Sequence, residues 1–136
     1  MKAVVDTNVV AYYLLGTPRY ANESRAFLES ADQLVAPASW EAELANVVWM
    51  AVRTGVLPVK ESMGKLSLAV RLGVQTTSIR ALWGGAFLRS LKSGVAVYDT
   101  LFVELASRDR VRLATFDQKI LKAFPELACR PGEIAS

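Results

Sequence analysis

Four acidic residues occupy positions that are hard to explain as ordinary exposed surface charges. The chain has 136 residues and contains no histidine. Without imidazole the chain lacks a histidine base, a Ser-His-Asp triad and the common histidine-bearing zinc sites. A metal ion would have to be held by oxygen, and carboxylates suit hard cations such as Mg²⁺, Mn²⁺ or Ca²⁺. The four residues are Asp6, Glu43, Asp99 and Asp117.

Asp6 and Asp117 each follow a short apolar segment that predicts a buried parallel strand. Residues 3–5 form the first strand and residues 111–115 a later one. The carboxyl ends of parallel strands meet at one edge of a sheet, where ligands bind, so both acids are candidate site residues. Either acid could instead serve as the N-cap of the helix that follows it, because Asp is a favoured N-cap.

Glu43 lies in a predicted helix that spans residues 40–53. It shares a helical face with Trp40, Val47 and Met50, which are all apolar. A carboxylate among apolar neighbours costs several kcal/mol unless it is paired or binds a metal. Glu43 is therefore a candidate site residue, and an ion pair with a buried Arg is the structural alternative.

Asp99 opens a predicted helix over residues 97–107. Phe102, Val103 and Ala106 follow it at the spacings that place side chains on one helical face. This pattern predicts that Asp99 points inward. The alternative is an ordinary acid in the first turn of a helix, where the helix dipole favours negative charge.

Eight of the other nine acids have ordinary explanations as solvated charges, and for Glu41 a structural role in the first turn of its helix is favoured over a site role. They fall on polar helix faces, in first helical turns, in turns and in the tail, and Glu104 can pair with Arg108 four residues later. These residues are Glu23, Glu29, Asp32, Glu41, Glu61, Glu104, Asp109, Glu126 and Glu133.

Strand patterns and helix patterns alternate along the chain. This alternation predicts an α/β fold, a three-layer sandwich with a central parallel sheet of about four or five strands and helices on both faces. The length suits a single domain over residues 1–136. Strands are expected at 3–5, 34–36, 74–77, 111–115 and 127–129, and helices at 8–15, 20–30, 40–53, 58–72, 79–91, 97–107 and 118–124. Gly84 and Gly85 weaken the prediction of the fifth helix.

Composition favours a chain that is covered by a partner and does not enter a membrane. Hydrophobic residues make up 52% of the sequence, and the helices that carry Trp49, Met50, Leu57 and Met63 are candidates for covered surface. No apolar run approaches the roughly 20 residues that a membrane span needs, and Asp6 interrupts the only candidate for a signal peptide. A lone cysteine fits the reducing cytoplasm.

Four short motifs together resemble a known family. They are Asp6-Thr7-Asn8, Glu43-Leu44-Ala45-Asn46-Val47, Tyr98-Asp99-Thr100-Leu101 and Thr115-Phe116-Asp117. In their order and spacing they resemble the acidic motifs of PIN-domain ribonucleases, above all the VapC-type toxins of toxin-antitoxin pairs. The resemblance covers nearly the whole chain.

The resemblance implies a metal-dependent endoribonuclease in which Asp6, Glu43, Asp99 and Asp117 bind Mg²⁺ or Mn²⁺ and activate water. It also implies that Asn8 and Thr115 support this site, and that the partners are an RNA substrate, a cognate antitoxin and a second copy of the chain in a homodimer. Some relatives carry a further acid soon after the fourth. Here Lys119 and Lys122 follow Asp117 instead, a departure from the pattern that would hold a second metal ion independently, so the number of metal ions, one or two, stays open.

Charge is compatible with an RNA substrate. The formal net charge is +3, and if four of the 13 acids bind metal, nine acids remain against 16 Lys and Arg. Such an excess suits phosphate binding. Five of the basic residues lie near the fourth motif, namely Arg108, Arg110, Arg112, Lys119 and Lys122, although each is also explained as solvated surface.

Three other functions compete with this hypothesis. A phosphoryl-accepting receiver domain would need a second acid beside Asp6 and an acceptor Asp after a middle strand, and neither is present. A haloacid-dehalogenase-type phosphatase would need an Asp at the position of Asn8. The stronger alternative is a catalytically silent PIN-like module that binds RNA or a regulatory protein, and the intact acids argue against it.

Overall fold

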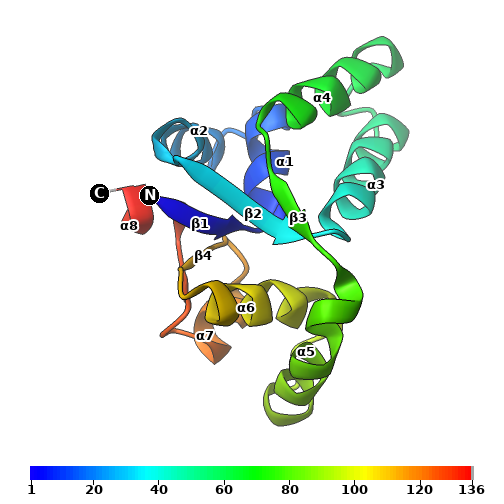
Figure 1. The fold of residues 1–136 in the computed structure, drawn as a ribbon. Coiled ribbons are helices and arrows are strands. Elements are labelled where there is room, and N and C mark those ends of the chain that lie inside the picture. Colours follow the sequence, from blue (N-terminus) through cyan, green and yellow to red (C-terminus); the bar gives the residue numbers. More distant parts are fainter. Residues whose placement is uncertain (136) are drawn as a thin grey trace.

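The computed structural model, which describes residues 1–135, contains a parallel five-stranded sheet between two layers of helices (Figure 1). The strand order is β3-β2-β1-β4-β5, so the first strand is central. The predicted three-layer α/β architecture is confirmed. The strands are Lys2–Val5 (β1), Gln33–Pro37 (β2), Gln75–Thr77 (β3), Leu113–Ala114 (β4) and Ala128–Cys129 (β5).

Eight helices surround this sheet in the described part of the chain. Helices α1 to α4 cover one face, α5 to α7 cover the other, and α8 packs beside α2 (Figure 1). Their bounds are Thr7–Leu15 (α1), Ala21–Ser30 (α2), Trp40–Arg53 (α3), Val59–Arg71 (α4), Ile79–Ser93 (α5), Val97–Asp109 (α6), Gln118–Ala123 (α7) and Pro131–Ala135 (α8).

The centre of the core explains why the first strand is apolar throughout. Ala3, Val4 and Val5 are fully buried, because β1 pairs with β2 on one side and with β4 on the other while helices cover both faces. From Thr100 to Ala106, every residue of helix α6 is buried, between the strands on one side and α5 on the other. The sheet and α6 thus form a rigid base from which the acids project.

Three elements differ from the sequence prediction, and the first is helix α8 (Pro131–Ala135), which lies where no helix was expected. The fourth strand was expected over residues 111–115, but only Leu113–Ala114 form the ladder, because β5 beside it is equally short. Helix α5 continues through Gly84 and Gly85 to Ser93, since its packing against α6 outweighs the low helix propensity of glycine.

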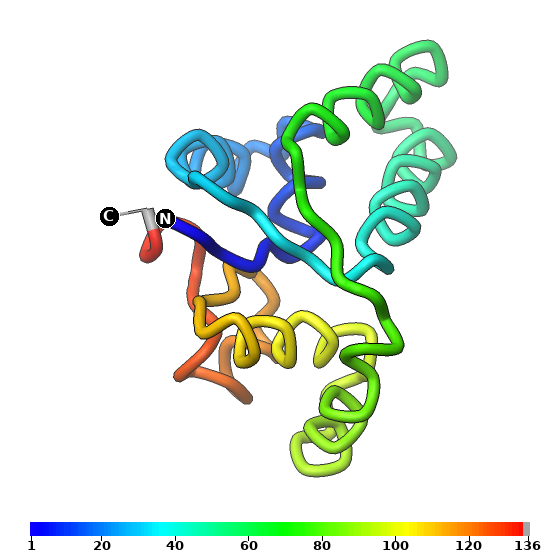
Figure 2. Tube along the Cα trace, viewed as in Figure 1, coloured from blue at the N-terminus to red at the C-terminus, as the bar shows by residue number. Residues whose placement is uncertain are grey.

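The tube in Figure 2 shows the chain passing through β3 from the layer of α3 and α4 to the layer of α5. The carboxyl ends of β1 and β2 point toward the side where these helices extend beyond the sheet (Figures 1 and 2). Within the described residues, no helix has both the length and the apolar character needed to cross a lipid bilayer.

Candidate functional site

A cavity of about 340 Å³ opens where β1 ends, and the four acids singled out from the sequence all line it. Asp6 directly follows β1, and Asp117 directly precedes α7. Glu43 and Asp99 lie in the first turns of α3 and α6. The fold therefore brings together side chains that are up to 111 positions apart in the sequence, and their role as metal ligands stays a prediction.

Asp6 is the most buried of the four acids, with 7% of its surface exposed. Thr115 donates a hydrogen bond from Oγ1 to Asp6 Oδ2 at 2.6 Å, and Asn8 Nδ2 donates to the same oxygen at 3.3 Å. Its side chain makes no capping bond to α1. Burial raises the pKa of Asp6 to about 7; the Thr115 bond lowers it, and the charges of Asp99 and Glu43 raise it. Thr115 and Asn8 thus hold the Asp6 carboxyl in place.

Glu43 has no basic partner, so the alternative of a buried ion pair with Arg does not apply in the described residues. Its Oε1 accepts a hydrogen bond from Thr7 Oγ1 at 3.1 Å. Burial raises the pKa of Glu43, the Thr7 bond lowers it, and the negative charge of Asp99 raises it further. The Thr7 hydroxyl therefore orients Glu43 toward the cavity.

Asp99 and Asp117 line the same cavity, and their negative charges repel each other. Burial and then the charge of Asp117 raise the pKa of Asp99, while the positive charge of Lys119 lowers it. Asp117 is also an N-cap, as its structural alternative predicted, because its Oδ1 accepts from the Lys119 backbone N–H at 2.8 Å. Its own N–H donates to Thr115 Oγ1 at 3.0 Å. One carboxylate thus caps α7 and faces the cavity.

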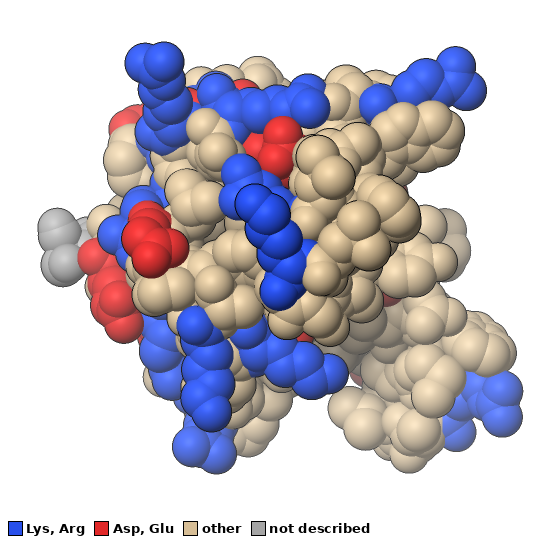
Figure 3. Space-filling view, turned by 90° about the horizontal axis from the view of Figure 1, so that it is seen from below, with Lys and Arg blue, Asp and Glu red and all other residues tan. Residues whose placement is uncertain are grey.

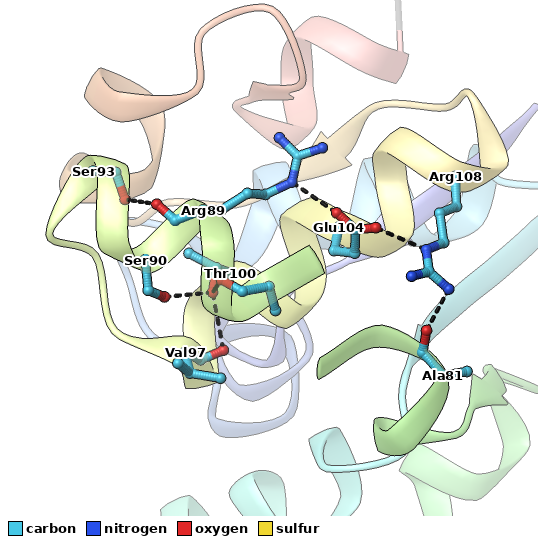
Figure 4. Close-up of polar contacts among 9 residues, drawn as sticks. Ala81, Arg89, Ser90, Ser93, Val97, Thr100, Glu104 and Arg108 are labelled. Atoms are coloured by element: carbon cyan, nitrogen blue, oxygen red, sulfur yellow. Dashed lines mark hydrogen bonds and ion pairs between the residues drawn. The ribbon is translucent and has the colours of Figure 1, made fainter. Parts of the chain in front are cut away.

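The first turn of α6 is fixed by the residue next to Asp99. Thr100 is fully buried, and its Oγ1 donates to the carbonyl oxygen of Ala86 at 2.8 Å and lies 2.8 Å from Ser90 Oγ. Figure 4 shows the Thr100–Ser90 contact between α5 and α6. Helix α5 is therefore part of the support for Asp99, although it contributes no acid to the cavity.

Metal binding can be tested against the chemistry of this donor set. The four acids offer only oxygen, and in residues 1–135 none of them forms an ion pair with Lys or Arg. Burial is the main cause of the raised pKa values of Asp6, Glu43 and Asp99, and repulsion between the acids adds to it; a divalent cation would relieve this repulsion. The carboxylates stand apart around the cavity, since no three such groups in the described residues are close enough to hold one ion together. In chemical type, the residues fit a hard cation.

Several contributors to the cavity were not singled out from the sequence. Thr7 bonds to Glu43, and Tyr12 forms part of the wall. The Tyr12 ring stacks on Tyr20 with centroids 4.5 Å apart and meets Phe116 at 5.5 Å. Thr7 could have been found from its place between Asp6 and Asn8, but a tyrosine in an apolar helix carries no such indication.

The prediction that Glu104 is a solvated charge is wrong. Only 9% of the residue is exposed, and it binds Arg89 in addition to the expected Arg108. Burial raises the pKa of Glu104, but the hydrogen bonds and charges of the two arginines outweigh burial and lower it below its usual value. Arg89 lies 15 positions earlier on α5, so sequence spacing could not reveal this partner.

Two further expectations about exposure need correction. Met50 was expected beside Glu43 on an inward face, but it is exposed, because α3 turns this part of its surface away from the sheet. Leu57 was a candidate for covered surface, but it is buried against Val48 and Ala51. Trp49 and Met63 are exposed, as that hypothesis requires.

Two of the basic residues near the fourth motif serve the fold. Arg108 binds Glu104 and donates to the carbonyl oxygen of Ala81, and Arg112 donates to the carbonyl oxygens of Leu127 and Ala128. Lys119 and Lys122 lie on α7 instead, where their ammonium groups form no ion pair within the described residues.

Comparison with known proteins adds independent information. A family model described as PIN domain matches residues 3–126. Ribonuclease VapC3 of Pyrobaculum aerophilum is 30% identical over 129 residues, which span 93% of this chain and 98% of that protein. Ribonuclease VapC3 of Mycobacterium tuberculosis is 27% identical over 124 residues, which span 91% and 88% of the two chains.

A solved structure agrees in fold. A chain in the crystal structure of VapBC2 from Rickettsia felis, bound to a DNA fragment from their promoter, superposes with a TM-score of 0.67. The alignment covers 96% of this chain and 98% of that chain, at 15% sequence identity. At that sequence identity the superposition supports only a shared fold.

Proposed function

Because the chain belongs to the PIN-domain family, among its VapC-type ribonucleases, we propose that it is an endoribonuclease and the toxin of a toxin-antitoxin pair. The observation that carries this proposal is the cavity lined by Asp6, Glu43, Asp99 and Asp117. Four carboxylates without a basic partner in the described residues are costly to place around one cavity, and cation-assisted chemistry explains why they line it.

These four acids are the residues that would hold Mg²⁺ or Mn²⁺. Such an ion, when bound, lowers the pKa of water and neutralises charge that develops on a phosphodiester, so no histidine base is needed. The chain's own polar residues orient the ligands: Thr115 and Asn8 hold Asp6, and Thr7 holds Glu43. Asn8 also accepts from the backbone N–H of Phe116 at 3.4 Å, which ties the ends of β1 and β4 together.

Purified protein and a circular single-stranded RNA test this proposal. Only an endonuclease can open a circle, and we expect linear products with Mg²⁺ or Mn²⁺ and none after EDTA is added. Opening that is unaffected by EDTA would contradict the metal mechanism. If every RNA tested stays intact with metal while still binding the protein, the chain is the catalytically silent module instead.

Exposed apolar residues support the proposal that the chain binds an antitoxin and forms a homodimer. They lie on two separate surfaces, one on α3 and α4 and one along α5. Surfaces of this character are usually covered by a protein partner. The residues are Trp49, Met50, Val59 and Met63 on the first surface and Trp83, Phe87, Leu88 and Leu91 on the second. Light scattering tests the dimer, and a monodisperse monomer at micromolar concentration would contradict it.

Two smaller expectations go with this function. We expect residues 1–136 to act as one domain, since the family match runs over residues 3–126 without a break. We also expect a cytoplasmic protein, because Cys129 is buried and has no second cysteine in the chain to pair with.

A further inference from the structure

A second cavity lies between α5, α6 and α7, on the far side of α6 from the acid cavity. Its volume is about 520 Å³, and it shares no lining residue with the acid cavity. Arg89, Lys92 and Ser93 come from α5, Glu104 comes from α6, and Phe124 comes from the end of α7. A cavity of this size, with a few polar groups on an apolar wall, has the dimensions of a small-molecule site.

Glu104 fixes the arginine in this cavity. Arg89 Nε donates to Glu104 Oε1 at 2.9 Å, and Arg108 Nε donates to Glu104 Oε2 at 2.7 Å. Figure 4 shows the two terminal nitrogens of Arg89 pointing away from Glu104. A guanidinium that is held at one edge presents its other N–H groups in a fixed geometry, which suits a planar or tetrahedral oxyanion.

The charge around this cavity is positive. Among the described residues, Glu104 is the only acid that lines it, beside Arg89 and Lys92, and Glu104 also binds Arg108. On α7, Lys122 directly precedes Ala123, which belongs to the lining. Figure 3 shows the molecule from below, where more Lys and Arg side chains than acids are visible and the acids lie among them. The ligand that this charge favours is an anion.

Helix α7 connects the two cavities. Asp117 at its start lines the acid cavity, and Ala123 at its end lines the second one. The helix has six residues, so it spans about 9 Å. Lys119 acts electrostatically on Asp99, and Lys122 follows one turn later. Positive charge therefore continues from the acids to the second cavity.

The wall of the second cavity also offers apolar surface. Phe124, at the end of α7, is half-buried in this wall. Aromatic and aliphatic side chains beside basic residues are the combination with which proteins hold single-stranded nucleic acid, because bases pack on the former and phosphates bind the latter.

We propose that this second cavity binds a nucleotide of the RNA substrate away from the bond that is cut, with its phosphate on Arg89 and Lys92. This inference rests on the proposed function, because it takes RNA to be the substrate. The site contributes affinity and position, and it takes no part in the chemical step.

The test compares two single-charge variants for RNA binding without cleavage. Lys92→Gln removes an exposed charge at the cavity, and Lys60→Gln removes an exposed charge on α4 as the matched control. Fluorescence anisotropy of a short labelled single-stranded RNA, in EDTA and over a salt series, reports the affinity. We expect Lys92→Gln to bind several-fold more weakly, with a salt slope shallower by about 0.7, and Lys60→Gln to match the unaltered protein.

The outcomes separate this inference from the proposed function. If the protein opens circular RNA but Lys92→Gln binds RNA as Lys60→Gln does, the second cavity is not an RNA site and the function stands. If Lys92→Gln weakens RNA binding in a protein that cuts no RNA, the cavity stands and the cleavage proposal fails. A parallel titration with inorganic phosphate identifies the source of the anion. Phosphate binding that Lys92→Gln abolishes without a change in RNA affinity would overturn the proposal.

Discussion

Helix α6 carries two inward carboxylates whose surroundings are opposite. Asp99 in the first turn faces Asp117 and the other cavity acids, and burial and negative charge raise its pKa. Glu104, five residues later, is clamped between Arg89 and Arg108, and its pKa is lowered although burial opposes the shift.

The difference between these two residues shows what each carboxylate does for the protein. Glu104 has its counter-charges within the chain and so stabilises the packing of α5 on α6. Asp99 and its neighbours have no basic ion-pair partner in residues 1–135, so the like charges around the cavity oppose folding, and under the proposed function a bound cation would offset this cost. Removing the negative charge should therefore lower the stability of the folded protein at Glu104 and should not lower it at Asp99.

The largest expected effect is on catalysis. Asp99→Asn should lower RNA cleavage about 100-fold or more, because it removes a charged oxygen ligand from the cavity. The melting temperature in EDTA should not fall. Cleavage rates of the variant and of Glu41→Gln, which alters an exposed acid on α3, provide the measurement and its control. Equal losses in both variants would argue against a special role for Asp99.

Glu104→Gln should do the reverse. Two arginines then lose their shared carboxylate, and the free energy of unfolding should fall by about 2 kcal/mol, a figure reduced because both arginines are partly exposed. Urea denaturation measures the change. A variant as stable as the unaltered protein would mean that the clamp contributes nothing, and the contrast with Asp99 would then be lost.

Two adjacent glycines on α5 provide a second test of the Glu104 clamp, that is, of Glu104 held between Arg89 and Arg108. A Cβ at Gly85 would collide with Cδ and both carboxylate oxygens of Glu104, which the arginines hold in place, whereas nothing lies within 4 Å of a Cβ at Gly84. Gly84→Ala should raise the free energy of unfolding by up to about 1 kcal/mol through helix propensity, and Gly85→Ala should lower it by about 1.5 kcal/mol. Chemical denaturation of both variants gives the comparison. Gains of the same size at both positions would show that Glu104 moves aside freely.

Glu43→Gln should raise the stability of the metal-free protein. The substitution relieves repulsion at nearly constant volume, so in EDTA the variant should be more stable by about 1 kcal/mol. With Mg²⁺ the order should reverse, because the variant has lost a ligand and gains less from binding. Thermal melts in both conditions decide the matter. Lower stability of the variant in both would instead indicate a structural role for Glu43.

The smallest effect is the pH dependence of the Glu104 clamp. Because the pKa of Glu104 is lower in the folded protein than its ordinary value of 4.5, its contribution to stability is present above that value and disappears as the pH falls through the folded pKa. The stability difference between the unaltered protein and Glu104→Gln should therefore shrink in acid. A denaturation series over pH, in EDTA, measures it. A difference that stays constant to the acid end of the series would contradict this prediction.

The same two sites differ in how much of each could be predicted from the sequence. The four cavity acids were recognisable because local patterns place each one at a strand end or on an inward helical face, and a parallel sheet brings strand ends together. The burial of Glu104 was not recognisable, since Arg89 belongs to another helix and only the packing of α5 on α6 brings it near. Likewise the length of β4 depends on its pairing with β5, and the burial of Leu57 depends on its contacts with α3.

Asp117 lies in the cavity and also caps α7 through its bond from the Lys119 N–H. The two tasks make different demands, because a cap needs only an oxygen acceptor, which Asn supplies about as well as Asp, whereas a cation ligand gains from the negative charge. A survey of substitutions scored by folding would accept Asn at this position, and one scored by activity would reject it. Whether a substitution is tolerated at residue 117 thus depends on whether folding or activity is measured, and not on the fold alone.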